Sequence, residues 1–173
     1  MVIKIREETP EDYSDITLIN DLAFGQKQEG ELIANLRIRP EYIKELSLVA
    51  CSGKKIVGHI LFFPVTISAN GSDIETISLG PMSVLPEFQK KGVGGALIIN
   101  GMKKAEKMGY KSIVVLGHPG YYPKFGFSRS SFWRIKAPFD APDEAMMAIE
   151  LIPGSLEFGG GIINYPREFY DAI

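Results

Sequence analysis

The sequence lacks several features that mark other classes of protein. It has one cysteine, Cys51, so no intramolecular disulfide can form, and a reducing compartment, the cytoplasm, is expected. No run approaches the roughly 20 apolar residues of a membrane span, and the first residues have no apolar core like that of a signal peptide. The formal net charge is only −2, so neither nucleic acid nor an anionic membrane is an expected partner. Any phosphate binding must therefore depend on a local feature.

Metal-binding patterns are also missing. Two histidines and one cysteine do not provide the ligand spacing of a zinc site, so no metal is expected. Cys51 is interpreted as a small buried hydrophobe and His59 as a packed or edge residue of a strand. The chain has 173 residues, 45% of them hydrophobic and 23% charged, without an internal repeat or a long linker. We therefore expect one globular domain over residues 1–173.

Capping and turn signals predict a mixed α/β fold. Residues 2–6 alternate as in an edge strand, Thr9 and Pro10 begin a helix that Gly25 ends, and residues 28–37 form a second helix.

An antiparallel meander of three strands is predicted next, at residues 46–51, 55–67 and 74–84. Pro81 interrupts the third strand. Because proline has no N–H to donate to a ladder, a bulge or an unpaired stretch is expected there.

The second half of the chain begins with an amphipathic helix at residues 92–108 and an apolar strand at residues 111–116, which complete a strand–helix–strand unit. Further elements are expected after it: strands around residues 127–135 and 145–151, a poorly ordered glycine stretch at 159–161, and a short helix at 166–173.

The turn at residues 89–95 has the composition of an anion site. The first N–H groups of a helix have no intrahelical partners and lie at its positive end, so a turn that leads into a helix binds phosphate well. Glycines keep such a backbone accessible, and basic or amide side chains add donors. The residues that do so here are Gln89, Lys90, Lys91, Gly92, Gly94 and Gly95. A tight structural turn would explain the glycines alone, whereas the lysines, the strand and the amphipathic helix together favour a phosphate site.

This segment, LGPMSVLPEFQKKGVGGALI, resembles the acetyl-CoA-binding motif of the GCN5-related N-acetyltransferases (GNAT), Gln/Arg-x-x-Gly-x-Gly/Ala, which Gln89, Gly92 and Gly94 match. Downstream, YPKFGF at residues 122–127 is similar to the family's Tyr-x-(Lys/Arg)-x-Gly-Phe segment. The surrounding GHPGYYPKFGF is similar to an uncharacterised bacterial branch of the family. The resemblance implies a mainly antiparallel central sheet with a splayed, bulged strand, flanked by helices.

The resemblance also implies an activity, the direct transfer of an acetyl group from acetyl-CoA to an amine without an acyl-enzyme. The matching cofactor contacts are Met82, Ser83 and Val84 for the pantetheine arm and thioester carbonyl, and Gln89, Lys90, Lys91, Gly92, Val93, Gly94 and Gly95 for the pyrophosphate. Tyr122 matches the tyrosine that often protonates the leaving thiolate. Packing in an aromatic cluster is the alternative interpretation of Tyr122.

Other roles stay open. No general base is visible, and the glutamates that could act as one are interpreted as solvated surface acids in preference to a base: Glu29, Glu31 and Glu75. Many relatives carry an asparagine after the strand that ends near residue 116. Residues 117–120 contain none, and His118 is the candidate to replace it. Trp133 fits either a core or a substrate pocket.

Three functions fit these observations. The first is an acetyl-CoA-dependent N-acetyltransferase that acts on an amine of a small molecule or a protein. The alternatives are a catalytically weak acyl-CoA-binding sensor or partner module, and an acyltransferase that uses a longer acyl chain or an alcohol acceptor. No motif identifies the acceptor. The apolar segment at residues 162–165 could support a homodimer.

Overall fold

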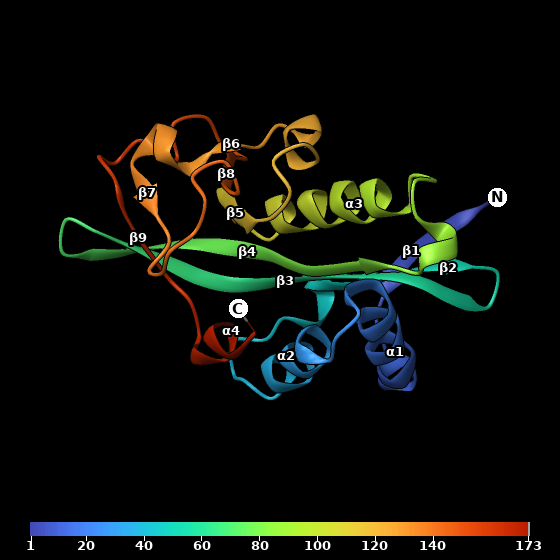
Figure 1. Cartoon of the computed structure of the whole chain (residues 1–173). Helices are drawn as coiled ribbons and strands as arrows, with labels where there is room; N and C mark the ends of the chain where they lie inside the picture. The colour runs from blue at the N-terminus through green and yellow to red at the C-terminus, as the bar shows by residue number, and fades with distance from the viewer. Residues whose placement is uncertain (173) are drawn as a thin grey trace. The chain divides into compact units, whose positions relative to one another are not determined.

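The computed structural model describes residues 1–172 (Figure 1). Its helices are α1 (Tyr13–Phe24), α2 (Gln28–Arg37), α3 (Val93–Lys107) and α4 (Arg167–Asp171). Its strands are β1 (Ile3–Glu7), β2 (Ser47–Ser52), β3 (Lys55–Ala69), β4 (Ser72–Val84), β5 (Ser112–Leu116), β6 (Ser128–Arg129), β7 (Ile135–Lys136), β8 (Met146–Glu150) and β9 (Gly161–Asn164). The fold is mixed α/β, with a mostly antiparallel open sheet flanked by helices, which confirms the predicted class.

Two compact units make up the chain. Unit 1 comprises Met1–Phe63, Gly80–Lys104 and the C-terminal segment from Arg167, and unit 2 comprises Pro64–Leu79 and Ala105–Pro166. Strands β3 and β4 contribute residues to both units.

In unit 1 the strand order is β1-β2-β3-β4, with α3 on one face and α1, α2 and α4 on the other (Figure 1). Thr9 and Pro10 begin a 3-10 turn, η1 (Pro10–Asp12), that leads into α1 at Tyr13, so the first α-helix begins three residues later than predicted. The Thr9 N–H donates to the Asp12 carboxylate at 2.8 Å before α1 begins, and Gly25 ends α1 in the left-handed conformation at φ +68°. Helix α2 has the predicted bounds.

Glycines let α3 approach β3 closely. A Cβ at Gly58 would lie 3.1 Å from both the Leu97 side chain and the Ser83 carbonyl oxygen. A Cβ at Gly101 would lie 2.0 Å from the ring of Phe62, which is fully buried and therefore has no room to move. The first turns of α3 are thus held at a fixed distance from the sheet.

A buried polar cluster joins several elements of unit 1. Glu8, with a side chain only 1% exposed, accepts a hydrogen bond from Arg37 Nε at 2.9 Å and another from the Tyr42 hydroxyl. His59 Nε2 lies 3.2 Å from Glu8 Oε2 and 2.8 Å from Ser47 Oγ. Because a carboxylate only accepts, we assign the proton of neutral His59 to Nε2. Within residues 1–172, Nδ1 of His59 is buried without a hydrogen-bond partner.

The environment of this cluster shifts the pKa values of His59 and Glu8, among others. Burial lowers the pKa of His59, because charging the ring in the core is costly, although Glu8 opposes the shift. Burial would raise the pKa of Glu8, but hydrogen bonds from His59, Arg37 and Tyr42 outweigh it and hold that pKa well below its ordinary value. The native cluster therefore contains neutral His59 beside ionised Glu8.

His59 should make the protein sensitive to mild acid. Since its folded pKa lies below the unfolded value of about 6.5, the unfolded chain binds the extra proton first, and stability falls as the pH drops below about 6.5. The loss should reach up to about 1.4 kcal/mol of unfolding free energy per pH unit, until the folded pKa is passed. Chemical denaturation at several pH values should show this slope in the wild type and not in His59→Gln.

The other histidine provides the control, because the chain has only two. His118 is exposed, so His118→Gln should keep the wild-type slope. An equal slope in His59→Gln would contradict the assignment of a neutral buried His59.

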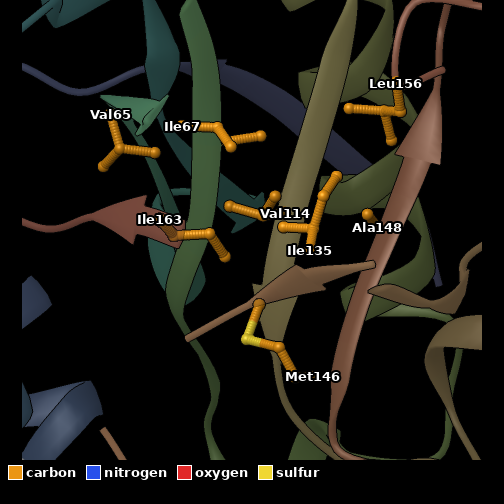
Figure 2. Packing of buried hydrophobic residues seen from close by; sticks show 8 residues of the cluster. All are labelled: Val65, Ile67, Val114, Ile135, Met146, Ala148, Leu156 and Ile163. Atoms are coloured by element: carbon orange, nitrogen blue, oxygen red, sulfur yellow. The ribbon is translucent and has the colours of Figure 1, made fainter. Parts of the chain in front are cut away.

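In unit 2, β5 pairs in parallel with β4 and antiparallel with β8, which also pairs with β6. Strand β9 pairs with β3 and β7. The core of this unit, shown in Figure 2, gathers apolar side chains from β3, β5, β7, β8, β9 and one loop: Val65, Ile67, Val114, Ile135, Met146, Ala148, Leu156 and Ile163. Trp133 packs against this cluster, which supports its interpretation as a core residue.

The turn between β3 and β4 has the expected chemistry. Asn70 and Gly71 both have positive φ, at +52° and +78°, as both central residues of a type I′ hairpin turn must. Strand β4 continues through the cis Gly80–Pro81 bond to Val84. Its parallel pairing with β5 covers Ile77–Leu79, on the N-terminal side of the proline.

Two local predictions were wrong. The expected strand at residues 127–135 is divided into β6 and β7 by a 3-10 turn, η5 (Ser130–Trp133), which Arg134 ends in the left-handed conformation at φ +59°. The glycine stretch at residues 159–161, expected to be poorly ordered, leads directly into β9. Because β9 pairs with strands distant in sequence, local patterns did not predict it.

Candidate functional site

The backbone of the predicted phosphate turn adopts conformations that leave the start of α3 open. Lys90 and Gly92 have φ values of +59° and +85°, in the left-handed region that glycine adopts at no steric cost. The Gly92 carbonyl accepts the first helical hydrogen bond, from the Ala96 N–H at 3.0 Å. Gly92 is therefore the N-cap residue of α3, and the helix begins at Val93.

The next three amides have no backbone acceptor among residues 1–172. In the part of the chain that the structure describes, the N–H groups of Val93, Gly94 and Gly95 make no hydrogen bond to another backbone group. Gly92 is exposed, Gly95 is half-buried and Gly94 is buried. Unpaired N–H groups at the positive end of a helix form a site for an anion. These donors lie at the turn for which the sequence predicts a pyrophosphate site, and that role stays a prediction.

Neighbouring contacts fix this turn in place. The Gln89 side-chain amide donates to the Val84 carbonyl at 3.0 Å, which ties the turn to the end of β4. The Leu85 N–H donates to the Val57 carbonyl at 2.9 Å on β3. Gln89 thus supports the turn from its own side chain, in addition to any contact with a ligand.

The strand before the turn contains an unpaired buried hydroxyl. Ser83 is 3% exposed, and among the described residues its Oγ has no hydrogen-bond partner. Met82 and Val84, on either side, are half-buried. The predicted pantetheine contacts Met82, Ser83 and Val84 therefore lie consecutively at the end of β4, and residues 85–88 connect them to the phosphate turn.

Two lysines near the turn contact the aromatic ring of Phe88, a residue outside the motif. Phe88 ends the 3-10 turn η3 (Pro86–Phe88). The Lys55 and Lys91 ammonium groups lie 5.5 and 5.7 Å from the centre of its ring, within reach of cation–π attraction. Lys55 Nζ also lies 3.3 Å from Glu87. Lys90 is exposed.

Tyr122, the predicted proton donor, lies in an aromatic cluster of unit 2. It begins the 3-10 turn η4 (Tyr122–Phe125) and packs edge-on against Tyr121 and Phe127, with centroid distances of 5.3 and 5.8 Å. A Cβ at Gly117 would lie 2.4 Å from its ring, so glycine is needed below it. Burial, with a smaller contribution from Tyr121, raises the pKa of Tyr122 to about 12. The phenol therefore keeps its proton at any ordinary pH.

The candidate bases differ in their surroundings. Glu31 and Glu75 are exposed, and Glu29 is half-buried and accepts a hydrogen bond from Gln26 at 2.6 Å. His118 is also exposed. Cys51 is buried, as predicted. No cluster of metal-binding side chains is found in residues 1–172, and no helix of that range is long and apolar enough to cross a membrane.

Fold and turn together define a protein with a mixed α/β sheet and an anion site at the start of its amphipathic helix. The model of the acetyltransferase (GNAT) domain matches residues 4–130. Similarity to YjhQ, an uncharacterised N-acetyltransferase of Escherichia coli K12, reaches 38% identity over 134 residues, 77% of this chain and 74% of that protein. The chain belongs to the GNAT family, and it is accordingly an acyltransferase of the N-acetyltransferase class.

Further relatives cover nearly the whole chain. YhbS, another uncharacterised N-acetyltransferase of Escherichia coli K12, is 25% identical over 166 residues, 95% of this chain and 97% of that protein. A GNAT acetyltransferase from Brucella melitensis, solved with acetyl-CoA, is 31% identical, with a TM-score of 0.79 over 97% of this chain and 98% of that one. The structure of Escherichia coli YhbS with CoA shares the fold, with a TM-score of 0.89 at 24% identity over 97% of this chain and 92% of that one.

Proposed function

We propose that this protein transfers an acetyl group from acetyl-CoA directly to an amine of a small molecule or a protein. The observation that carries the proposal is the set of unpaired N–H groups at the start of α3, from Val93 to Gly95. Family membership and the acetyl-CoA in the Brucella melitensis relative support acetyl-CoA as the donor.

The proposed cofactor contacts divide between two segments. The N–H groups of Val93, Gly94 and Gly95, with Lys90 and the open backbone of Gly92, would hold the pyrophosphate, and Lys91 would add positive charge beside it. The end of β4, at Met82, Ser83 and Val84, would bind the pantetheine arm, and a backbone N–H there would stabilise charge that develops on the thioester oxygen. Gln89 would orient both segments, since its side chain joins them.

The reaction requires two proton movements. The acceptor nitrogen, once neutral, forms a bond to the acetyl carbon, while the bond from that carbon to sulfur breaks and sulfur takes the electron pair. The nitrogen loses a proton to a base or to water, and the sulfur gains one. We assign the second movement to the Tyr122 hydroxyl, which keeps its proton at neutral pH because burial raises its pKa to about 12.

Calorimetry with acetyl-CoA and an assay of thiol release over a panel of amines test this proposal. Binding in the micromolar to low-millimolar range followed by thiol release is the expected result. Binding without release from any amine would favour a sensor or partner module instead. No binding at millimolar acetyl-CoA would refute the cofactor site itself.

Three further predictions from the sequence stay predictions: a cytoplasmic location, a homodimer and one domain over residues 1–173. The segment proposed for dimerisation forms β9, where Ile162 is 50% exposed and Ile163 is fully buried. A dimer through this segment would thus rely on Ile162, and sedimentation of Ile162→Ser tests it.

A further inference from the structure

The lysines beside the phosphate turn exceed what a pyrophosphate at the helix start requires. Two turns of unit 1 contribute Lys54, Lys55, Lys90 and Lys91, against one acid, Glu87, in a chain whose net charge is −2. Lys55 Nζ lies 3.3 Å from Glu87 of η3, the 3-10 turn that leads into the phosphate turn. These turns therefore carry a net positive charge, although the net charge of the whole chain is negative.

Phe88 brings two of these charges together. Lys55 comes from the start of β3 and Lys91 from the phosphate turn, yet both ammonium groups lie within 6 Å of the same ring centre. Phe88 is half-buried, and the backbone bond from Phe88 N–H to the Leu85 carbonyl, 2.8 Å long, closes the turn that carries it. Two flexible side chains that share an aromatic partner lose less freedom on binding a ligand than unrestrained lysines would.

The pyrophosphate has its own donors, the unpaired amides of Val93, Gly94 and Gly95. Coenzyme A carries a second, chemically separate anion, the phosphate on the 3′ carbon of its ribose. An ammonium pair is suited to such a group, because lysine binds phosphate as a point charge without demanding one geometry. The opposing acid, Glu87, is exposed and weakens the site only partly.

We propose that Lys55 and Lys91, held over Phe88, form a subsite for the 3′-phosphate of coenzyme A, so that the protein distinguishes this cofactor from 3′-dephospho-coenzyme A. This inference rests on the proposed function, since it requires the pyrophosphate at the start of α3. Lys55 is the first residue of β3, outside the recognised motif, and its assignment comes from the contacts with Phe88 and Glu87 alone.

Calorimetric titration of the full chain with coenzyme A and with dephospho-coenzyme A tests the subsite. The wild type should bind coenzyme A about tenfold more tightly, the effect of two exposed charge pairs with one phosphate. This ratio should fall as salt is added. In the double variant Lys55→Gln/Lys91→Gln, it should drop to about twofold or less, mainly through weaker binding of coenzyme A.

Matched variants separate the subsite from general charge. Lys103→Gln removes the same charge from an exposed position on α3, about ten residues and roughly 15 Å beyond the helix start, and should keep the wild-type ratio. Glu87→Gln removes the competing acid and should raise the ratio of the affinity for coenzyme A to that for dephospho-coenzyme A. Thermal unfolding of each variant checks that the fold is intact.

The outcomes distinguish the 3′-phosphate subsite from the acetyl-CoA site on which it depends. A ratio that falls in the double variant but not in Lys103→Gln supports the subsite. Equal binding of both ligands to the wild type, or a ratio unchanged in the double variant, overturns the subsite and leaves the acetyl-CoA site standing. Failure of both ligands to bind overturns the proposed function together with the subsite.

Discussion

Replacing Gly92 by aspartate should weaken acetyl-CoA binding by about 100-fold and change the melting temperature little. Gly92 is the N-cap of α3, and a Cβ there meets no other atom within 4 Å. An aspartate side chain can turn onto the amides of Gly94 and Gly95, as N-cap carboxylates do. It would then occupy the donors proposed for the pyrophosphate and repel that anion by about 2–3 kcal/mol after solvent screening, which corresponds to the stated loss.

The effect on stability should be small because two contributions oppose each other. The cap stabilises the helix by about 1 kcal/mol, whereas a side chain at φ +85° costs about as much. Gly92→Asn is the matched control, since asparagine also caps and tolerates this conformation but carries no charge. Calorimetry should show a clearly smaller loss for Gly92→Asn. Equal affinity of the wild type and Gly92→Asp would place the pyrophosphate elsewhere.

Replacing Tyr122 by phenylalanine should lower turnover by about 100-fold while acetyl-CoA affinity stays within about twofold. The variant keeps the ring that packs on Gly117, Tyr121 and Phe127 and removes only the hydroxyl. Proton transfer from a phenol with a pKa near 12 to a thiolate whose acid has a pKa near 8.5 is uphill. The expected effect therefore lies at the lower end of the range for general acids.

The matched control is Tyr121→Phe, which removes a neighbouring half-buried hydroxyl from the same aromatic cluster and should leave turnover nearly unchanged. The pH profile gives a second test. Tyr122 would lose its proton only near pH 12, so any decline in rate below pH 10 should persist in Tyr122→Phe. Wild-type turnover in Tyr122→Phe would remove Tyr122 from the reaction and leave it a packing role.

The candidate site was predictable where its signals are local. Gly92, Gly94 and the preceding lysines lie within six residues, and a backbone turn of that length is specified by its own sequence. The contribution of Lys55 was not predictable in this way. It depends on the contact of β3 with the end of β4, where the Leu85 N–H donates to the Val57 carbonyl, and this contact brings Lys55 beside Glu87 and Phe88, more than thirty positions away.

Glu8, Arg37 and His59 show the same limit. Each looks like an ordinary polar residue in the sequence, and only the packing of α2 on the sheet joins them as a buried charged cluster. The sequence alone gives no reason to expect a neutral histidine there, because the pKa shift comes from burial that the sequence does not state.

By itself the sequence determined the bounds of α2, the Asn70–Gly71 turn and the phosphate turn with its helix, since capping residues, glycines and periodicity act over a few positions. Only the tertiary structure decided the role of Gly161. A Cβ at Gly161 would lie 2.6 Å from the Ser68 carbonyl oxygen, so glycine there lets β9 approach β3. A glycine that favours disorder in isolation thus forms a strand, because strand pairing between distant residues supplies the hydrogen bonds that local sequence cannot.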